Sequence, residues 1–76
     1  MRGDPTAVAA GLGETVRRER RARGLSQDDL ALSAGLGLRA VHDVEAGKAT
    51  AQLATWVKAL DALDMDVAAV ARRRRL

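Results

Sequence analysis

The stretch GLSQDDLALSAGLGLRAVHDVEAGK, residues 24–48, determines the fold of this chain. Ser26 suits the cap of a helix, and Asp29, three residues later, supplies the partner of a short capping box. Gly35 then ends that helix, and only two residues separate it from the next periodic segment. The spacing predicts two helices joined by a tight, glycine-containing turn, which is a helix-turn-helix.

The second helix of this pair is expected over residues 38–46, where Val41 and Val44 form its buried side before Gly47 ends it. A helix turns by about 100° per residue, so the side chains opposite these valines face solvent. The second helix of a helix-turn-helix enters the DNA major groove, and its solvent-facing side is the one that reads base edges. The residues on that side are Arg39, His42, Asp43 and Ala46.

Upstream of this unit, the pattern predicts a helix over residues 12–23. Asp4 followed by Pro5 also has the form of a helix cap and a first-turn proline, so a helix can begin there. Glycines at positions 11 and 13 each cost about 1 kcal/mol inside a helix, which disfavours a continuous helix from Pro5. Residues 1–11 are therefore expected to form an N-terminal arm or an extra helical turn.

Downstream, Thr50 is a candidate cap for a further helix whose apolar residues repeat at helical spacing. The residues expected to close the core are Leu53, Trp56, Val57, Leu60 and Leu63. The following segment, 64–70, contains an apolar and polar alternation typical of a short strand, and it is a candidate dimerisation strand. Residues 71–76 form a basic tail whose charge density favours disorder.

The composition bounds the size and chemistry of the domain. Seventy-six residues make one small domain, and a chain of this size buries only about 60% of its unfolded surface, so dimerisation is expected. The sequence has no cysteine, which excludes disulfides and thiolate metal sites. Aromatic residues make up 1% of the chain, the single Trp56, so a base-stacking surface for single strands is disfavoured.

The net charge of +3 is unevenly distributed along the chain. Residues 1–24 carry six arginines against three acids, residues 25–66 carry three cations against seven acids, and residues 67–76 add four arginines. The segment with the candidate reading helix is net acidic, so DNA affinity depends on a few placed groups and on flanking arginines. No apolar stretch approaches the roughly 20 residues of a membrane span and no secretory leader is present, which predicts a soluble, cytoplasmic protein.

Glu45, Gly47 and Lys48 stand at the end of the second helix, at the spacing of a known motif. With them, the chain resembles the Cro/cI-like Xre helix-turn-helix family over about residues 12–63. The resemblance implies an all-α, compact, four- to five-helix, lambda-repressor-like domain, and it allows a short C-terminal strand that pairs across a dimer. It implies a homodimer that binds a palindromic operator in double-stranded DNA. It also implies a structural ion pair between Arg20 and Glu45.

A narrower resemblance lies in residues 47–63, which are similar to the fourth helix of HipB-type antitoxins, with Asp64-Met65-Asp66-Val67 in the place of their strand. It implies the antitoxin of a type II toxin–antitoxin operon, which represses its own operon and binds a HipA-like kinase toxin in the bacterial cytoplasm, at the nucleoid. Free-standing Xre regulators use a similar fourth helix. A regulator without a toxin partner therefore stays open, as does a protein-interaction adaptor.

The candidate site residues divide by what they are expected to touch. Arg39 is the first candidate for guanine recognition, and its pairing with Asp43 in solvent is the alternative. Gln27 and Lys48, which flank the two helices of the unit, are candidate phosphate contacts. The other candidates on the reading helix are Leu38, which stands where the family commonly has a polar reader and suits a thymine methyl, Ala40, His42 and Asp43. The candidate dimer contacts are Trp56, which also suits the core, Met65 and Val67.

An enzyme is disfavoured as an alternative reading of the acidic residues. His42 is the only histidine, and the acids occur at helix ends and exposed positions without the spacing of a nucleophile elbow, a P-loop or a metal site. We therefore expect no catalytic residue, no metal and no cofactor.

Overall fold

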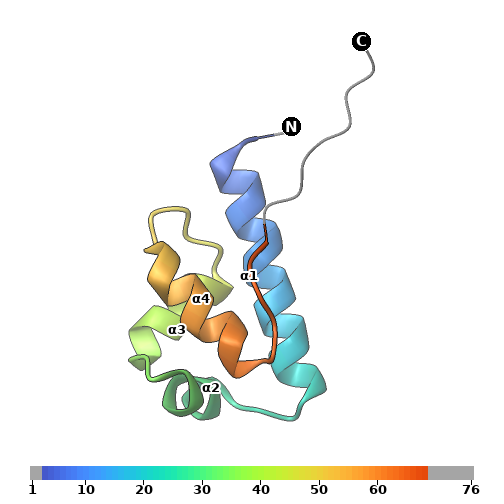
Figure 1. The fold of residues 1–76 in the computed structure, drawn as a ribbon, viewed down its shortest axis with the longest axis vertical. Coiled ribbons are helices and arrows are strands. Elements are labelled where there is room, and N and C mark those ends of the chain that lie inside the picture. Colours follow the sequence, from blue (N-terminus) through green and yellow to red (C-terminus); the bar gives the residue numbers. More distant parts are fainter. Residues whose placement is uncertain (1–2, 69–76) are drawn as a thin grey trace.

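The computed structural model describes residues 3–68, and over this range the chain forms four α-helices (Figure 1). The expected all-α fold is confirmed over these residues. A long first helix is followed by two short helices and then by a fourth. Helix α3 packs against each of the other three helices, while α2 and α4 also pack against each other. The bounds are α1, Pro5–Ala22; α2, Gln27–Ala34; α3, Leu38–Glu45; and α4, Leu53–Ala62.

One apolar core lies between the four helices. Its largest fully buried side chains come from α1, α2 and α3 and from the residue after α4: Val16, Leu30, Val41, Val44 and Leu63. Trp56 is 5% exposed within the same core. Trp56 therefore belongs to the core of the single chain, and its role at a dimer interface stays a prediction.

Helix α1 begins at Pro5, so residues 5–11 are helical and the helix is longer than the predicted 12–23. Asp4 caps it, with Oδ1 accepting a hydrogen bond from the backbone N–H of Thr6 at 3.0 Å. The propensity cost of Gly13 is offset by packing, because this buried glycine lets α1 approach the backbone at the end of α3. A Cβ at position 13 would lie 2.6 Å from the carbonyl oxygen of Val44.

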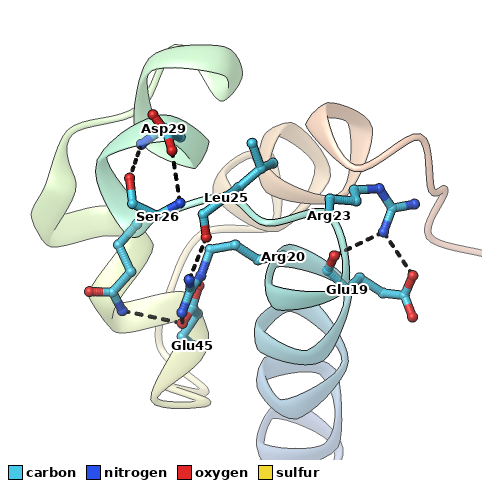
Figure 2. Close-up of polar contacts among 8 residues, drawn as sticks. Glu19, Arg20, Arg23, Leu25, Ser26, Asp29 and Glu45 are labelled. Carbon is cyan, nitrogen blue, oxygen red and sulfur yellow. Dashed lines mark hydrogen bonds and ion pairs between the residues drawn. The ribbon is translucent and has the colours of Figure 1, made fainter.

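The predicted capping box at the start of α2 is confirmed. Ser26 Oγ accepts a hydrogen bond from the backbone N–H of Asp29 at 3.0 Å, and Asp29 Oδ2 accepts one from the backbone N–H of Ser26 at 2.9 Å (Figure 2). Gly35 ends α2 with a φ of +68°, a left-handed conformation that glycine adopts without steric cost. Gly37 then begins α3 without a side-chain cap, so the turn between the helices is as tight as the spacing predicts.

Helix α4 begins at Leu53 with Gln52 as its cap, which corrects the prediction of Thr50. The backbone N–H of Ala51 donates to the carbonyl of Lys48 at 3.0 Å, so Thr50 lies inside a turn that ends before the helix begins. The predicted apolar stripe is only partly buried. Leu53 is 68% exposed and Val57 is 45% exposed, so their predicted burial within one chain is wrong.

The segment after α4 is tied to the end of α1. Arg23 donates from Nη2 to the carbonyl of Leu63 at 2.7 Å. It also donates from Nη1 to the carboxylate of Glu19 at 2.8 Å (Figure 2). Residues 65–68 have no regular secondary structure in the single chain, with Met65 partly packed on the core and Val67 exposed. The rest of the predicted strand, 69–70, and the predicted basic tail, 71–76, lie outside the described residues.

Candidate nucleic-acid interface

Helix α3 presents one continuous side to solvent. Val41 and Val44 are fully buried on the inner side of this helix, which fixes the rotation of α3 about its own axis. The Arg39 side chain is 87% exposed on the opposite side. His42, Ala46 and, to a smaller extent, Leu38 and Asp43 are also accessible there, whereas Ala40 is half-buried. The expected reading side is therefore an exposed surface of the folded chain.

Asp43 lies between the two cations of this surface. Its Oδ1 is 3.9 Å from Arg39 Nε and 3.9 Å from Lys48 Nζ. At these distances, between exposed side chains, such pairs contribute between about 0 and 1 kcal/mol to stability. The Arg39–Asp43 distance is too long for a hydrogen bond, so the guanidinium donors of Arg39 stay available for another acceptor. The two roles proposed for Arg39 are geometrically compatible.

Beneath this surface, the expected ion pair between Arg20 of α1 and Glu45 of α3 is present. Arg20 Nε donates to Glu45 Oε2 at 2.6 Å, and Nη2 donates to Oε1 at 3.0 Å. Arg20 Nη1 also donates to the carbonyl of Leu25 at 2.8 Å, so the guanidinium joins α1, the loop before α2, and α3 (Figure 2). The two side chains are 10% and 5% exposed, which makes this an internal link and not a DNA contact.

The ionisation of Glu45 follows from these partners. Burial alone raises the pKa of Glu45, but hydrogen bonds from Arg20 and Gln27 and the positive charges of Arg20 and Arg17 more than offset it, so the pKa of Glu45 lies below its ordinary value. The hydrogen bond to Glu45 likewise raises the pKa of Arg20. Both groups are therefore charged at neutral pH.

Gln27 has a partner that the sequence did not suggest. Its Nε2 donates to Glu45 Oε1 at 3.2 Å, and its side chain is partly buried at the start of α2. The hydrogen bond positions Gln27 against α3 and leaves the second N–H of its amide for another acceptor. Arg20, Gln27 and Glu45 thus connect three helices through one carboxylate.

An open groove of about 560 Å³ lies beside this connection. We call it the α1–α3 groove, since most of its lining belongs to those helices and the start of α2 completes it. Two of its exposed residues, Arg17 and Arg21, were not among the sequence-predicted site residues; their spacing of four positions on α1 is the signal that points to a shared side. The lining residues are Arg17, Arg20, Arg21, Ser26, Gln27, His42, Glu45 and Ala46.

Comparison with known proteins agrees with this geometry. Residues 16–70 match the helix-turn-helix family. The chain belongs to the Xre helix-turn-helix family. The match includes α2, α3, α4 and the C-terminal part of α1 from Val16 onward. The Xre-family protein is therefore a DNA-binding regulator.

One relative of the Xre-family protein comes from Sinorhizobium fredii (strain NBRC 101917 / NGR234) and is named an uncharacterized HTH-type transcriptional regulator, y4mF. The two sequences are 43% identical over 68 residues, which cover 87% of this chain and 90% of the relative. The likeness therefore extends over most of this chain and most of the relative. A bilayer crossing requires a longer and more apolar helix than any that residues 3–68 form.

Proposed function

We propose that this Xre-family protein is a transcriptional repressor that binds a specific sequence of double-stranded DNA through α3. The observation that carries the proposal is the position of Arg39, which projects from the exposed side of a helix that Val41 and Val44 anchor in the core. A major groove about 12 Å wide accepts one helix in this orientation. Such a protein acts in the bacterial cytoplasm, at the nucleoid.

Each exposed side chain of α3 has a proposed partner in the groove. The planar guanidinium of Arg39 matches the O6 and N7 acceptors of guanine. Leu38 suits the thymine methyl, while Asp43 either accepts from cytosine N4 or holds Arg39 in place. His42 is proposed as a backbone contact at the edge of the surface, and Ala40, which is half-buried, as a small contact.

Two polar residues flank α3 and suit the DNA backbone. Gln27 has a free amide N–H at the start of α2, where unpaired backbone N–H groups favour an anion. Lys48 follows α3 and is exposed, with Asp43 3.9 Å from its Nζ. Phosphate contacts of this kind fix the register of the helix on the duplex without reading its sequence.

We propose that the repressor acts as a homodimer on a palindromic operator. The support is apolar surface that one chain leaves uncovered: Leu53 and Val57 lie one turn apart on α4, and Val67 is exposed beyond it. Met65, which lies in the sequence between the exposed α4 residues and Val67, is partly buried. A second copy that covers this surface sets two α3 helices against half-sites about 34–36 Å apart.

The residue pattern of 47–63 supports a narrower proposal, in which the protein is a HipB-like antitoxin that represses its own operon and binds a HipA-like kinase toxin. The second candidate is a free-standing regulator, and the relative named only as a transcriptional regulator favours it. We also infer that the protein is not an enzyme, since acids such as Asp28, Asp61 and Asp64 lie exposed at or near helix ends.

The test uses the full chain and a fluorescent duplex from the region upstream of its gene, with a random duplex of equal length as the control. We expect salt-sensitive binding that favours the upstream duplex, and equal affinity for both duplexes would contradict sequence-specific repression. Sedimentation of the free protein as a monomer at micromolar concentration would contradict the dimer. Co-expression with the neighbouring reading frame distinguishes the candidates, because an antitoxin retains that product through purification and a free-standing regulator does not.

A further inference from the structure

Two arginines of α1 face the α1–α3 groove from one side. Arg17 and Arg21 are exposed, and they are separated by four residues, a rise of about 6 Å along the helix. Gln27 and His42 line the groove from the other helices. Because Arg20 is neutralised by Glu45, the groove carries a net charge of two positive units from Arg17 and Arg21.

These two arginines differ from the others that the structure describes. Arg18 lies 3.6 Å from a carboxylate oxygen of Glu19, and Arg23 lies 2.8 Å from the other. Within residues 3–68, Arg17 and Arg21 make no side-chain hydrogen bond and no ion pair. Like charges at this spacing destabilise a helix by about 0.2–0.5 kcal/mol. Their placement is therefore not explained by the stability of α1.

The rest of the domain is net acidic, so the positive charges of Arg17 and Arg21 are important for binding a polyanion such as DNA. Residues 25–66, which contain α2, α3 and α4, carry three cations against seven acids. A helix-turn-helix of this composition is repelled by a duplex unless cations outside it offset the repulsion. Among the residues described, α1 is the element that holds unpaired arginines next to α3.

We propose that the α1–α3 groove binds the sugar-phosphate backbone of the same DNA that α3 reads, with Arg17 and Arg21 as its phosphate ligands. The proposal rests on the proposed function. His42 and Ala46 belong both to the groove and to the exposed side of α3, so the two surfaces are continuous. A backbone strand borders the major groove on each side, and the strand that passes α3 on this side lies over the two guanidinium groups. Arginine is suited to this role because its planar fork matches a phosphate.

The experiment compares two double variants of the full chain. Arg17→Ala with Arg21→Ala removes the proposed ligands, and Arg18→Ala with Lys58→Ala removes the same charge from exposed positions outside the groove. Affinity is measured against salt on the upstream duplex and on a random duplex of equal length. The groove variant is expected to lose affinity for both duplexes by a similar factor, with a salt slope lower by about 1.8.

A third variant separates charge from shape. Arg17→Lys with Arg21→Lys keeps both positive charges and is expected to retain the salt slope of the unaltered protein. All variants change exposed residues, so their Tm is expected within about 4 °C of the unaltered protein, which verifies that they fold.

The outcomes separate this inference from the function on which it rests. An unchanged slope in the groove variant, or an equal loss in the control variant, overturns the role of the groove while the proposed function stands. If the unaltered protein binds neither duplex, the groove proposal and the proposed function are both overturned. A selective loss on the upstream duplex alone would show that these arginines read bases, which also contradicts the proposal.

Discussion

The carboxylate of Glu45 on α3 accepts two hydrogen bonds from the guanidinium of Arg20 on α1, one of 2.6 Å from Nε and one of 3.0 Å from Nη2. This pair fixes the proposed reading helix to the helix that carries the groove arginines. Gln27 of α2 donates to the same carboxylate at 3.2 Å. The relative positions of three helices therefore depend on one ionised side chain.

Removing the charge of Glu45 is expected to destabilise the fold. In Glu45→Gln, Arg20 stays buried without its counter-ion, and breaking one partner of a buried pair costs about 3–5 kcal/mol. Urea unfolding at pH 7 measures the loss. The control is Glu14→Gln, an exposed glutamate on α1, for which we expect a change within about 0.5 kcal/mol. Equal stability of the two variants would show that the pair contributes nothing.

The stability of the protein is expected to depend on pH through the same residue. The pKa of Glu45 is lower in the folded state than its ordinary 4.5, so its stabilising contribution is present above that value and is lost as the pH falls through the folded pKa. Unfolding free energies of the unaltered protein and of Glu45→Gln should therefore begin to converge as the pH falls below 4.5. A difference that stays constant from pH 7 to pH 3 would contradict this assignment.

Much of the helix-turn-helix is predictable from sequence because its signals are local. Ser26 and Asp29 cap α2, Gly35 ends it, and the valine spacing of α3 places the exposed side. The start of α1 is not predictable in this way. Glycine at position 13 reads as a weak helix former, and only the approach of α3 shows why it is tolerated.

That approach predicts opposite effects for two alanine substitutions on α1. Gly11 is exposed with no atom within 4 Å of an added Cβ, so Gly11→Ala is expected to stabilise the protein by about 0.5–1 kcal/mol through helix propensity. In Gly13→Ala the new Cβ meets the carbonyl of Val44 at 2.6 Å and the backbone nitrogen of Gly47 at 2.9 Å. Overpacking of this kind costs about 1–3 kcal/mol. Thermal unfolding distinguishes them, and a gain in Tm for both would show that α1 does not pack tightly on α3.

The cap of α2 is expected to have a measurable effect on stability. Ser26→Ala removes the acceptor for the N–H of Asp29 and should cost about 1 kcal/mol. The matched control is Ser33→Ala, an exposed position inside α2, where alanine is the better helix former and a small gain is expected. If both substitutions shift Tm in the same direction by the same amount, the cap does not stabilise α2.

The candidate site is less predictable than the fold because its groups come from different helices. The sequence predicts Gln27 as a phosphate contact, and the structure also joins it to Glu45, 18 positions away. The groove arginines have no motif of their own. Leu53 and Val57 follow a core pattern, but residues 3–68 of one chain leave them exposed. A periodic pattern predicts which side is apolar and not which molecule covers it.

The two proposed kinds of DNA contact can be separated by comparing Arg39 with Lys48. Arg39→Ala is expected to weaken binding to the upstream duplex by about 1–3 kcal/mol, roughly 5- to 150-fold, and to change affinity for a random duplex much less, because the lost contact is to a base. Lys48→Ala is expected to weaken both duplexes alike and to lower the salt slope by about 0.9. Each side chain lies 3.9 Å from Asp43, so each variant removes one similar surface pair and their stabilities should match. A uniform loss for Arg39→Ala would make Arg39 a second phosphate contact and would leave guanine recognition without a residue on α3.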